Sequence, residues 1–416
     1  MIMKKTILFL SLLTSFVTPS VKAADFKAKA EHAIAIEANT GKILYEKDAT
    51  TPDAIASITK ILTAYLVYQE IDKGRLNWDT EITISDYPYQ LTVNPEASNV
   101  PMEARRYTVK DLINATMVAS ANSAAIALAE HIAGSEPQFV DMMSQQLKDW
   151  GITDAKLVNA SGLNNEFLGD NIYPGSQKTD ENMMSAKDVA IIAQHVIKDY
   201  PDLIQVSQQA RANFDGTTMV NHNAMLKDRP LYRSGVDGLK TGTTKKAGAS
   251  FVATATENGM RIITVILNAD NDDNDDMARF KVTNELLDYI AKHYEMKTIL
   301  KKGQALKNSH VKILDGKQLS VKVVAANDLR AVQPINQAVT AHFTSNQTEL
   351  VAPVKANQKV GDFIVSDKYL VGDGYLEEPP RVAAQTKKGV ERSFFLKVWW
   401  NRLVTYVNDH LVKKAR

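Results

Sequence analysis

The spacing of apolar residues changes character near residue 294, and this change divides the chain into two parts that must fold differently. Before it, most apolar residues recur at helical spacing, with strand-like alternation over 32–47 and in two adjoining runs over 249–267. After it, short alternating runs are separated by Gly and Asn-Asp turns. We therefore expect a mixed α/β (α+β) domain over residues 24–293, followed by a small all-β domain over residues 294–386.

Side chains that cap helices mark where helices of the first domain begin. Thr108 and Asp111 have the spacing of a capping box, in which each side chain accepts a hydrogen bond from the other residue's backbone. Ser185 and Asp188 precede a second helical pattern at the same spacing. The expected helices run over 57–74, 108–120, 124–132, 185–199 and 277–293.

The first 23 residues have the composition of a secretory signal peptide. Lys4 and Lys5 precede the apolar run Ile7–Val17, which is too short to span a bilayer, and small residues follow. We expect cleavage after Ala23 and export of the mature protein. An uncleaved N-terminal anchor is the alternative.

Composition excludes several classes of function. The formal net charge of +1 gives no basic surplus, so no nucleic-acid partner is expected. The absence of cysteine excludes disulfides, zinc–thiolate sites and cysteine nucleophiles, and no H-E-x-x-H zinc motif occurs. We expect neither a metal nor another cofactor. The acidic run over 270–276 lacks the order of an EF-hand loop and is interpreted as a solvated loop.

The first of three short motifs is Ser57-Ile58-Thr59-Lys60. At a spacing of three on a helix, the hydroxyl and the amine share one face. A serine hydroxyl needs a neighbouring base to become a nucleophile, and a lysine can be that base only if burial or a nearby cation lowers its pKa. Alone the motif is weak, because an ordinary solvated helix start explains most matches.

The other two motifs are equally weak when taken singly. Ser120-Ala121-Asn122 lies between two expected helices, where Ser and Asn are also common caps. Lys240-Thr241-Gly242-Thr243 opens the strand region and offers a cation and hydroxyls beside a glycine that lets a substrate backbone approach. An ordinary turn is the alternative for this segment.

The combination of the three motifs is specific. In this order, S-x-x-K, S-x-N and K-T-G match the set found in serine β-lactamases and penicillin-binding proteins. The chain resembles the low-molecular-mass penicillin-binding proteins that are D-alanyl-D-alanine carboxypeptidases of peptidase family S11, and most closely their Gram-positive branch. The resemblance covers essentially the whole chain and includes the segments 159–163, 238–248 and 394–400. It implies a serine β-lactamase/transpeptidase-like first domain.

The resemblance also implies a mechanism. Ser57 would attack the carbonyl between the last two D-alanines of a peptidoglycan stem peptide, and Lys60 would take its proton. Ser120, with Lys240 near it, would return a proton to the leaving D-alanine. Backbone N–H groups of Ser57 and Thr243 would form the oxyanion hole. Water would then release the acyl-enzyme, and β-lactam antibiotics would acylate Ser57 as covalent inhibitors.

The substrate-binding residues follow from the same resemblance. Asn122 would position the substrate, and Lys240, Thr241, Gly242 and Thr243 would hold its terminal carboxylate. Thr243 stands where some relatives carry a histidine, which leaves its side-chain contacts open. His222 stands where some relatives place a substrate-binding arginine, and a plain surface histidine is the alternative.

Three other functions compete with the carboxypeptidase. A class A β-lactamase needs a loop glutamate, but Glu166 lacks the surrounding E-x-x-L-N pattern. A transpeptidase would use an amine in place of water. A non-catalytic peptidoglycan-binding protein would not need all three motifs intact.

The chain is expected to close with a linker, Glu377–Glu391, which contains Pro379-Pro380, so that residues 387–416 comprise the end of this linker and an amphipathic helix over 393–416. Charges interrupt the helix too often for a membrane span, so we expect it to lie on the outer face of the cytoplasmic membrane. A helix packed on protein is the alternative. The expected apolar face comprises Leu396, Trp399, Trp400, Leu403, Val407 and Leu411, and the opposite face comprises Lys397, Asn401, Thr405, Asn408 and Asp409.

Overall fold

The computed structural model describes residues 26–270 and 275–407. The expected signal peptide and the last turns of the expected tail helix lie outside these ranges. A five-stranded antiparallel sheet forms the centre of the first domain, with the strand order β2-β1-β11-β10-β9. Its strands are β1 (Ala30–Glu37), β2 (Lys42–Lys47), β9 (Val236–Thr244), β10 (Gly248–Glu257) and β11 (Met260–Ala269). The alternation predicted over 32–47 and 249–267 is confirmed, and β9 is an edge strand.

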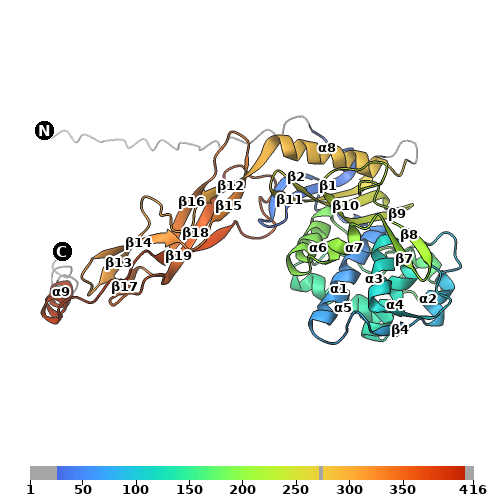
Figure 1. Ribbon diagram of the computed structural model, residues 1–416, viewed down its shortest axis with the longest axis horizontal. Helices are drawn as coiled ribbons and strands as arrows, with labels where there is room; N and C mark the ends of the chain where they lie inside the picture. Colours follow the sequence, from blue (N-terminus) through green and yellow to red (C-terminus); the bar gives the residue numbers. More distant parts are fainter. Residues whose placement is uncertain (1–25, 271–274, 408–416) are drawn as a thin grey trace, which may run out of the picture.

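Helices cover both faces of this sheet (Figure 1). Helix α8 packs on one face, where Ala33, Ala35 and Ile266 are buried. The remaining helices lie on the other face, where Ile34, Ile36 and Val265 are buried. The helices are α1 (Lys60–Asp72), α2 (Asp86–Leu91), α3 (Val109–Val118), α4 (Asn122–Ala133), α5 (Glu136–Asp149), α6 (Ala186–Asp199), α7 (Leu203–Ser207) and α8 (Ala278–His293), with 3₁₀ turns η1 (Ala56–Thr59) and η2 (Asn165–Phe167).

The predicted capping residues act as expected. Thr108 caps α3 and Ser185 caps α6, each in a complete capping box with an aspartate three residues later. The helix expected from residue 57 differs, because its first turn is the 3₁₀ turn η1 and α1 begins only at Lys60. Three short strand pairs complete the domain: β3 (Asp53–Ala54) with β6 (Met183–Met184), β4 (Glu81–Thr83) with β5 (Arg106–Thr108), and β7 (Arg211–Phe214) with β8 (Thr217–Val220).

The second part of the described chain is β-rich, as expected, and extends away from the first domain (Figure 1). Six strands form a sheet with the order β16-β18-β19-β14-β13-β17, and two more form the pair β12-β15. Its strands are β12 (Tyr294–Leu300), β13 (His310–Leu314), β14 (Ser320–Ala325), β15 (Leu329–Pro334), β16 (Thr340–Ser345), β17 (Glu349–Val351), β18 (Lys359–Ser366) and β19 (Arg381–Thr386). The chain after Pro379-Pro380 is therefore not a free linker, because β19 pairs there with β14 and β18.

The tail helix α9 (Phe395–Val407) lies at the end of the β domain that is far from the first domain (Figure 1). Among the side chains of α9 that the structure describes, Val398 alone is buried, and it is not on the apolar face predicted from the sequence. Leu396, Trp399 and Trp400 of that face are more than half exposed. No helix in the described part of the chain is long and apolar enough to cross a membrane.

A buried ion pair joins the two domains. The Lys42 ammonium, on β2, donates hydrogen bonds to the Asp367 carboxylate at 2.5 Å and to the backbone oxygen of Val332 at 3.0 Å. The Tyr375 hydroxyl donates to the same carboxylate. Burial lowers the pKa of Lys42, and Asp367 opposes that shift.

Candidate active site

The 3₁₀ turn η1 brings Ser57 against the first residue of α1. Residues three apart lie above one another in a 3₁₀ turn, and Nζ of Lys60 lies 2.9 Å from Oγ of Ser57. Ser57 is half-buried, whereas Lys60 is completely buried. The hydroxyl and the amine of the S-x-x-K motif are therefore in hydrogen-bond contact.

Neutral oxygens from two other segments surround the Lys60 ammonium. It donates hydrogen bonds to Oδ1 of Asn122 at 2.7 Å and to the backbone oxygen of Ser161 at 2.6 Å. Burial holds the pKa of Lys60 well below its usual value, and the nearby Lys240 lowers it further, while Glu136 opposes these effects. Lys60 therefore has both features that allow a lysine to act as a base, burial and a nearby cation.

A sharp turn between α3 and α4 presents the second motif. Ser120 has φ +58°, in the left-handed region, and Asn122 is the first residue of α4. The turn is held because Ala121 N–H donates to Ala115 and Asn122 N–H donates to Ser98. Ser120 is buried, but among the described residues its hydroxyl forms no hydrogen bond with Lys60 or Lys240.

The third motif lies on the edge strand β9, which packs against η1. Gly242 makes this packing possible, since a Cβ added there would lie 2.6 Å from the backbone oxygen of Ile55. On the other side of the turn, a Cβ on Gly162 would lie 1.9 Å from the backbone oxygen of Ala56. The Ser57 turn is therefore packed closely against two glycines, at which a side chain would not fit without a shift of the backbone.

The Lys240 side chain points into the protein. It is 3% exposed, and its ammonium donates to the backbone oxygen of Thr241 at 3.0 Å. Burial and the nearby Arg279 guanidinium lower the pKa of Lys240 to about 7. Near neutral pH this amine can therefore either carry or release a proton.

Two cavities meet at Thr243. One, of about 220 Å³, is lined by Ser57, Asn122 and Thr243 together with Glu96 and Glu166. The other, of about 260 Å³, is lined by Thr241 and Thr243 with residues of α8 and of the segment after β8. The two cavities therefore adjoin at Thr243, and we refer to them together as the groove.

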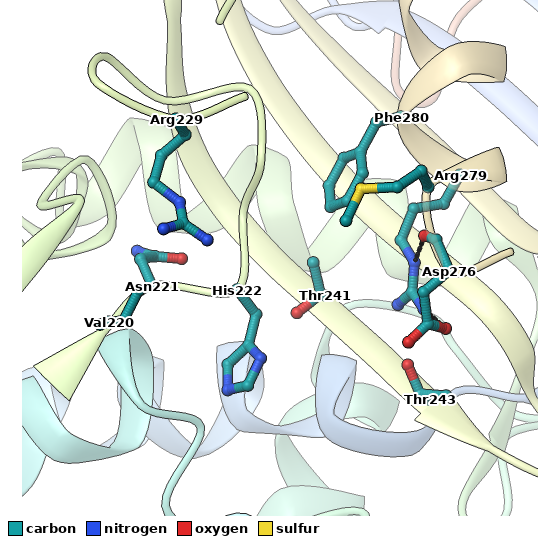
Figure 2. Close-up of a pocket in the computed structure, with 10 residues that line it drawn as sticks. Val220, Asn221, His222, Arg229, Thr241, Thr243, Asp276, Arg279 and Phe280 are labelled. Carbon is teal, nitrogen blue, oxygen red and sulfur yellow. Dashed lines mark hydrogen bonds and ion pairs between the residues drawn. The ribbon is translucent and has the colours of Figure 1, made fainter. Parts of the chain in front are cut away.

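Figure 2 shows the second cavity. His222 and Arg229 lie on one side of Thr241, and Arg279 with Asp276 lies on the other. Partial burial lowers the pKa of His222 to about 4, with a further contribution from Lys240, so this ring is neutral at physiological pH. His222 therefore lines the cavity but does not supply the positive charge of an arginine.

Sequence reasoning missed three ionisable residues near the site. Glu136 is buried, accepts hydrogen bonds from Ala160 N–H and the Tyr87 hydroxyl, and has a pKa raised by burial to about 7. Arg279 and Arg229 line the second cavity. No local pattern marks any of them, because only long-range packing brings them to β9 and α1.

Comparison with known proteins gives matches along most of the chain. The family model described as D-alanyl-D-alanine carboxypeptidase matches residues 18–271. The chain belongs to this family. A second model, described as penicillin-binding protein 5, C-terminal domain, matches residues 294–392.

Individual relatives agree with the family. D-alanyl-D-alanine carboxypeptidase DacF of Bacillus subtilis is 27% identical over 385 residues, covering 90% of both chains. The crystal structure of a peptidoglycan synthesis regulatory factor (PBP3) from Streptococcus pneumoniae is 51% identical, with a TM-score of 0.82, and covers 88% of this chain and 100% of that one. Penicillin-binding protein D2 from Listeria monocytogenes, solved in an ampicillin-bound form, is 27% identical with a TM-score of 0.53 and covers 64% of this chain and 98% of that one.

Proposed function

We propose that this member of the carboxypeptidase family removes the terminal D-alanine from peptidoglycan stem peptides through an acyl-enzyme on Ser57. The observation that carries the proposal is the contact between the Ser57 hydroxyl and a buried lysine that has no ion-pair partner among the described residues. Burial disfavours the charged form of such a lysine and so favours the form that can accept the serine proton.

The first chemical step is attack on the peptide bond between the two D-alanines. Neutral Lys60 takes the Ser57 proton as Oγ bonds to the carbonyl carbon. Backbone N–H groups of Ser57 and Thr243 stabilise the oxyanion. The amine of the leaving D-alanine receives this proton from Lys60 through Ser120 when the C–N bond breaks, and the shifted pKa of Lys240 suits a group that shares in this transfer.

The second step consumes water. Water adds to the acyl carbon as its proton passes to Lys60, and Lys60 returns that proton to Oγ when the C–Oγ bond breaks, which restores Ser57 and frees the shortened peptide. The edge strand β9 offers unpaired backbone groups to an extended peptide. Asn122 orients the acyl side of the substrate, while Thr241, Gly242 and Thr243 bind its carboxyl end.

We expect β-lactams to undergo the acylation step and to be hydrolysed only slowly afterwards. We expect an ampicillin-like ring to acylate Ser57, in line with the ampicillin-bound relative from Listeria monocytogenes. Slow hydrolysis of that product would make these compounds covalent inhibitors.

The direct test is incubation with a pentapeptide stem ending in D-Ala-D-Ala, followed by mass spectrometry. We expect release of one D-alanine by the parent and none by Ser57→Ala. Formation of cross-linked dimers would instead indicate a transpeptidase. No reaction, with no labelling by fluorescent penicillin, would overturn the enzymatic function.

One observation favours a β-lactamase as the second candidate. Glu166 is exposed and lines the same cavity as Ser57, so a carboxylate stands near the acyl-enzyme. If Glu166 activates the deacylating water, Glu166→Gln would trap the penicilloyl-enzyme while leaving acylation intact. For a carboxypeptidase we expect the penicilloyl-enzyme of the parent to be long-lived already.

We further propose that the protein is exported, loses residues 1–23 and binds the membrane surface through its tail. Exposed aromatic and aliphatic side chains on and next to α9 support the tail assignment. They are Phe394, Phe395, Leu396, Trp399, Trp400, Leu403, Val404 and Tyr406. Tryptophans and a wide apolar surface are typical of helices that lie in the membrane interface.

Truncation after residue 392 tests the tail. We expect the shortened protein to move from the membrane fraction to the soluble fraction and to keep its penicillin labelling. Unchanged membrane retention would contradict anchoring by α9. The mass of the mature protein tests cleavage, which should leave Ala24 as the first residue.

A further inference from the structure

The second cavity contains a guanidinium group that nothing in the described chain pairs with. Arg229, on the segment between β8 and β9, lines this cavity together with Thr241 and Thr243. Its Nε is buried without a hydrogen-bond partner, and its side chain forms no ion pair with any described residue. A buried donor without a hydrogen-bond partner lowers the stability of a fold. The unpaired Nε of Arg229 beside the groove therefore points to a ligand that accepts its hydrogen bond.

The other cations near Thr241 are already engaged or neutral. Arg279 uses four of its five N–H donors within the protein, to two backbone oxygens around β9 and to two oxygens of Asp276. Lys240 donates to the backbone and is buried, and His222 is neutral at physiological pH. Arg229 is therefore the cation of this cavity with the most free donors.

The ligand must carry an anionic group in the part that enters the second cavity. The first cavity contains Ser57 and Asn122, so it holds the acyl side of a substrate, and Thr243 connects it to the second cavity. What enters the second cavity is thus the leaving group. A carboxylate is the anion that a leaving D-alanine carries, and guanidinium groups bind carboxylates with paired hydrogen bonds.

We propose that Arg229 binds the terminal carboxylate of the leaving amino acid and sets the preference for substrates with a free carboxyl end. This inference rests on the proposed carboxypeptidase function and adds a specificity-determining residue to the third motif. Arg229 faces Arg279 across Thr241 (Figure 2). The carboxylate would therefore lie between the Arg229 guanidinium, whose donors are free in the described part of the chain, and the Arg279 guanidinium, most of whose donors already bind oxygens of the protein.

The test combines a substitution with a change of substrate. The parent, Arg229→Gln and Arg229→Lys are compared on a peptide ending in D-Ala-D-Ala and on the same peptide ending in D-alanine amide. On the acid, Arg229→Gln should lower kcat/KM roughly 10- to 100-fold, because a charged hydrogen bond is lost. On the amide the same variant should lose less than about threefold, and Arg229→Lys should recover part of the loss on the acid.

Arg211→Gln is the matched control, since Arg211 is exposed on β7 and forms no ion pair with a described residue. End-point labelling with fluorescent penicillin counts the reactive Ser57 in each preparation, so rates refer to folded enzyme. Equal losses on acid and amide, or no loss on the acid, would overturn the role of Arg229. A parent that takes no label and releases no D-alanine would instead overturn the proposed function.

Discussion

Lys60 and Lys240 in the first domain are buried as deeply as the side chains of Asp315 and Asp367 in the second. Only the two aspartates have ion-pair partners among the described residues: Lys42 for Asp367, and Arg392 and Arg402 for Asp315. A paired charge holds elements together, as Lys42 and Asp367 do between the domains, and there the carboxylate opposes the lowering of the Lys42 pKa by burial. Lys60 and Lys240 have no ion-pair carboxylate among the described residues, and burial lowers their pKa values so that they can exchange protons. The comparison distinguishes buried charges that are paired and stabilise the fold from buried charges that are unpaired and can take part in catalysis.

Lys60→Arg should have the largest effect, because it replaces an unpaired buried lysine with a cation that cannot act as a base. Arginine keeps a positive charge but does not lose its proton in proteins, so the serine loses its base. We expect acylation by penicillin to slow by roughly 10²- to 10⁴-fold, measured by stopped-flow fluorescence. Lys73→Arg, at the exposed end of α1, is the control. Acylation at the parent's rate in Lys60→Arg would show that Lys60 is not the base.

Asp367→Ala tests a paired charge. The substitution leaves Lys42 buried without its carboxylate, so the free energy of unfolding should fall by about 3–5 kcal/mol, measured by denaturant titration. Asp373→Ala, which removes the exposed partner of Lys187, should have a much smaller effect. Equal losses in the two variants would mean that burial of the Lys42 pair does not matter.

Lys240→Met should raise stability while abolishing peptidase activity. The pKa of Lys240 falls from 10.5 in the unfolded chain to about 7 in the fold, so the unfolded state binds more protons between these values. The stability cost of Lys240 is therefore full below pH 7 and disappears as pH rises to 10.5. We expect a gain on the order of 1–4 kcal/mol at pH 7, shrinking towards pH 10. A loss of stability would contradict the unpaired state of this lysine.

Gly242→Ala changes no charge and should have the smallest effect on stability. The added Cβ would press on the Ile55 oxygen and push β9 from the Ser57 turn. A destabilisation of about 1–3 kcal/mol is expected, with slower acylation by penicillin. Unchanged unfolding and acylation would show that the spacing between β9 and η1 is not set by this glycine.

Much of the fold follows from local patterns. The two hairpins, the capped helices α3 and α6, and the change to short strands after residue 294 depend on neighbours in the sequence, and they were predictable. The 3₁₀ turn at Ser57 was not, because Gly162 and Gly242 impose it from distant segments. β19 was hidden behind two prolines, and only its pairing with β14 and β18 makes it a strand.

The candidate site was predictable where short motifs carry the chemistry. Ser57, Lys60 and Asn122 come together as expected, and β9 places Lys240, Thr241, Gly242 and Thr243 beside them. Arg229, Arg279 and Glu136 escaped the sequence analysis, since their importance arises from burial and from contacts across the chain. In the tail, the amphipathic pattern could not reveal that Val398 is buried.

The central claim is that Lys60 acts as a neutral base, and the pH dependence of penicillin acylation tests it most directly. Because the base form increases with pH, the acylation rate constant should rise and then level off well below the ordinary lysine value of 10.5. Measurement in the parent between pH 5 and 11 gives the apparent pKa. A rate that still climbs steeply through pH 10 would contradict the claim, since Lys60 would then be protonated at physiological pH.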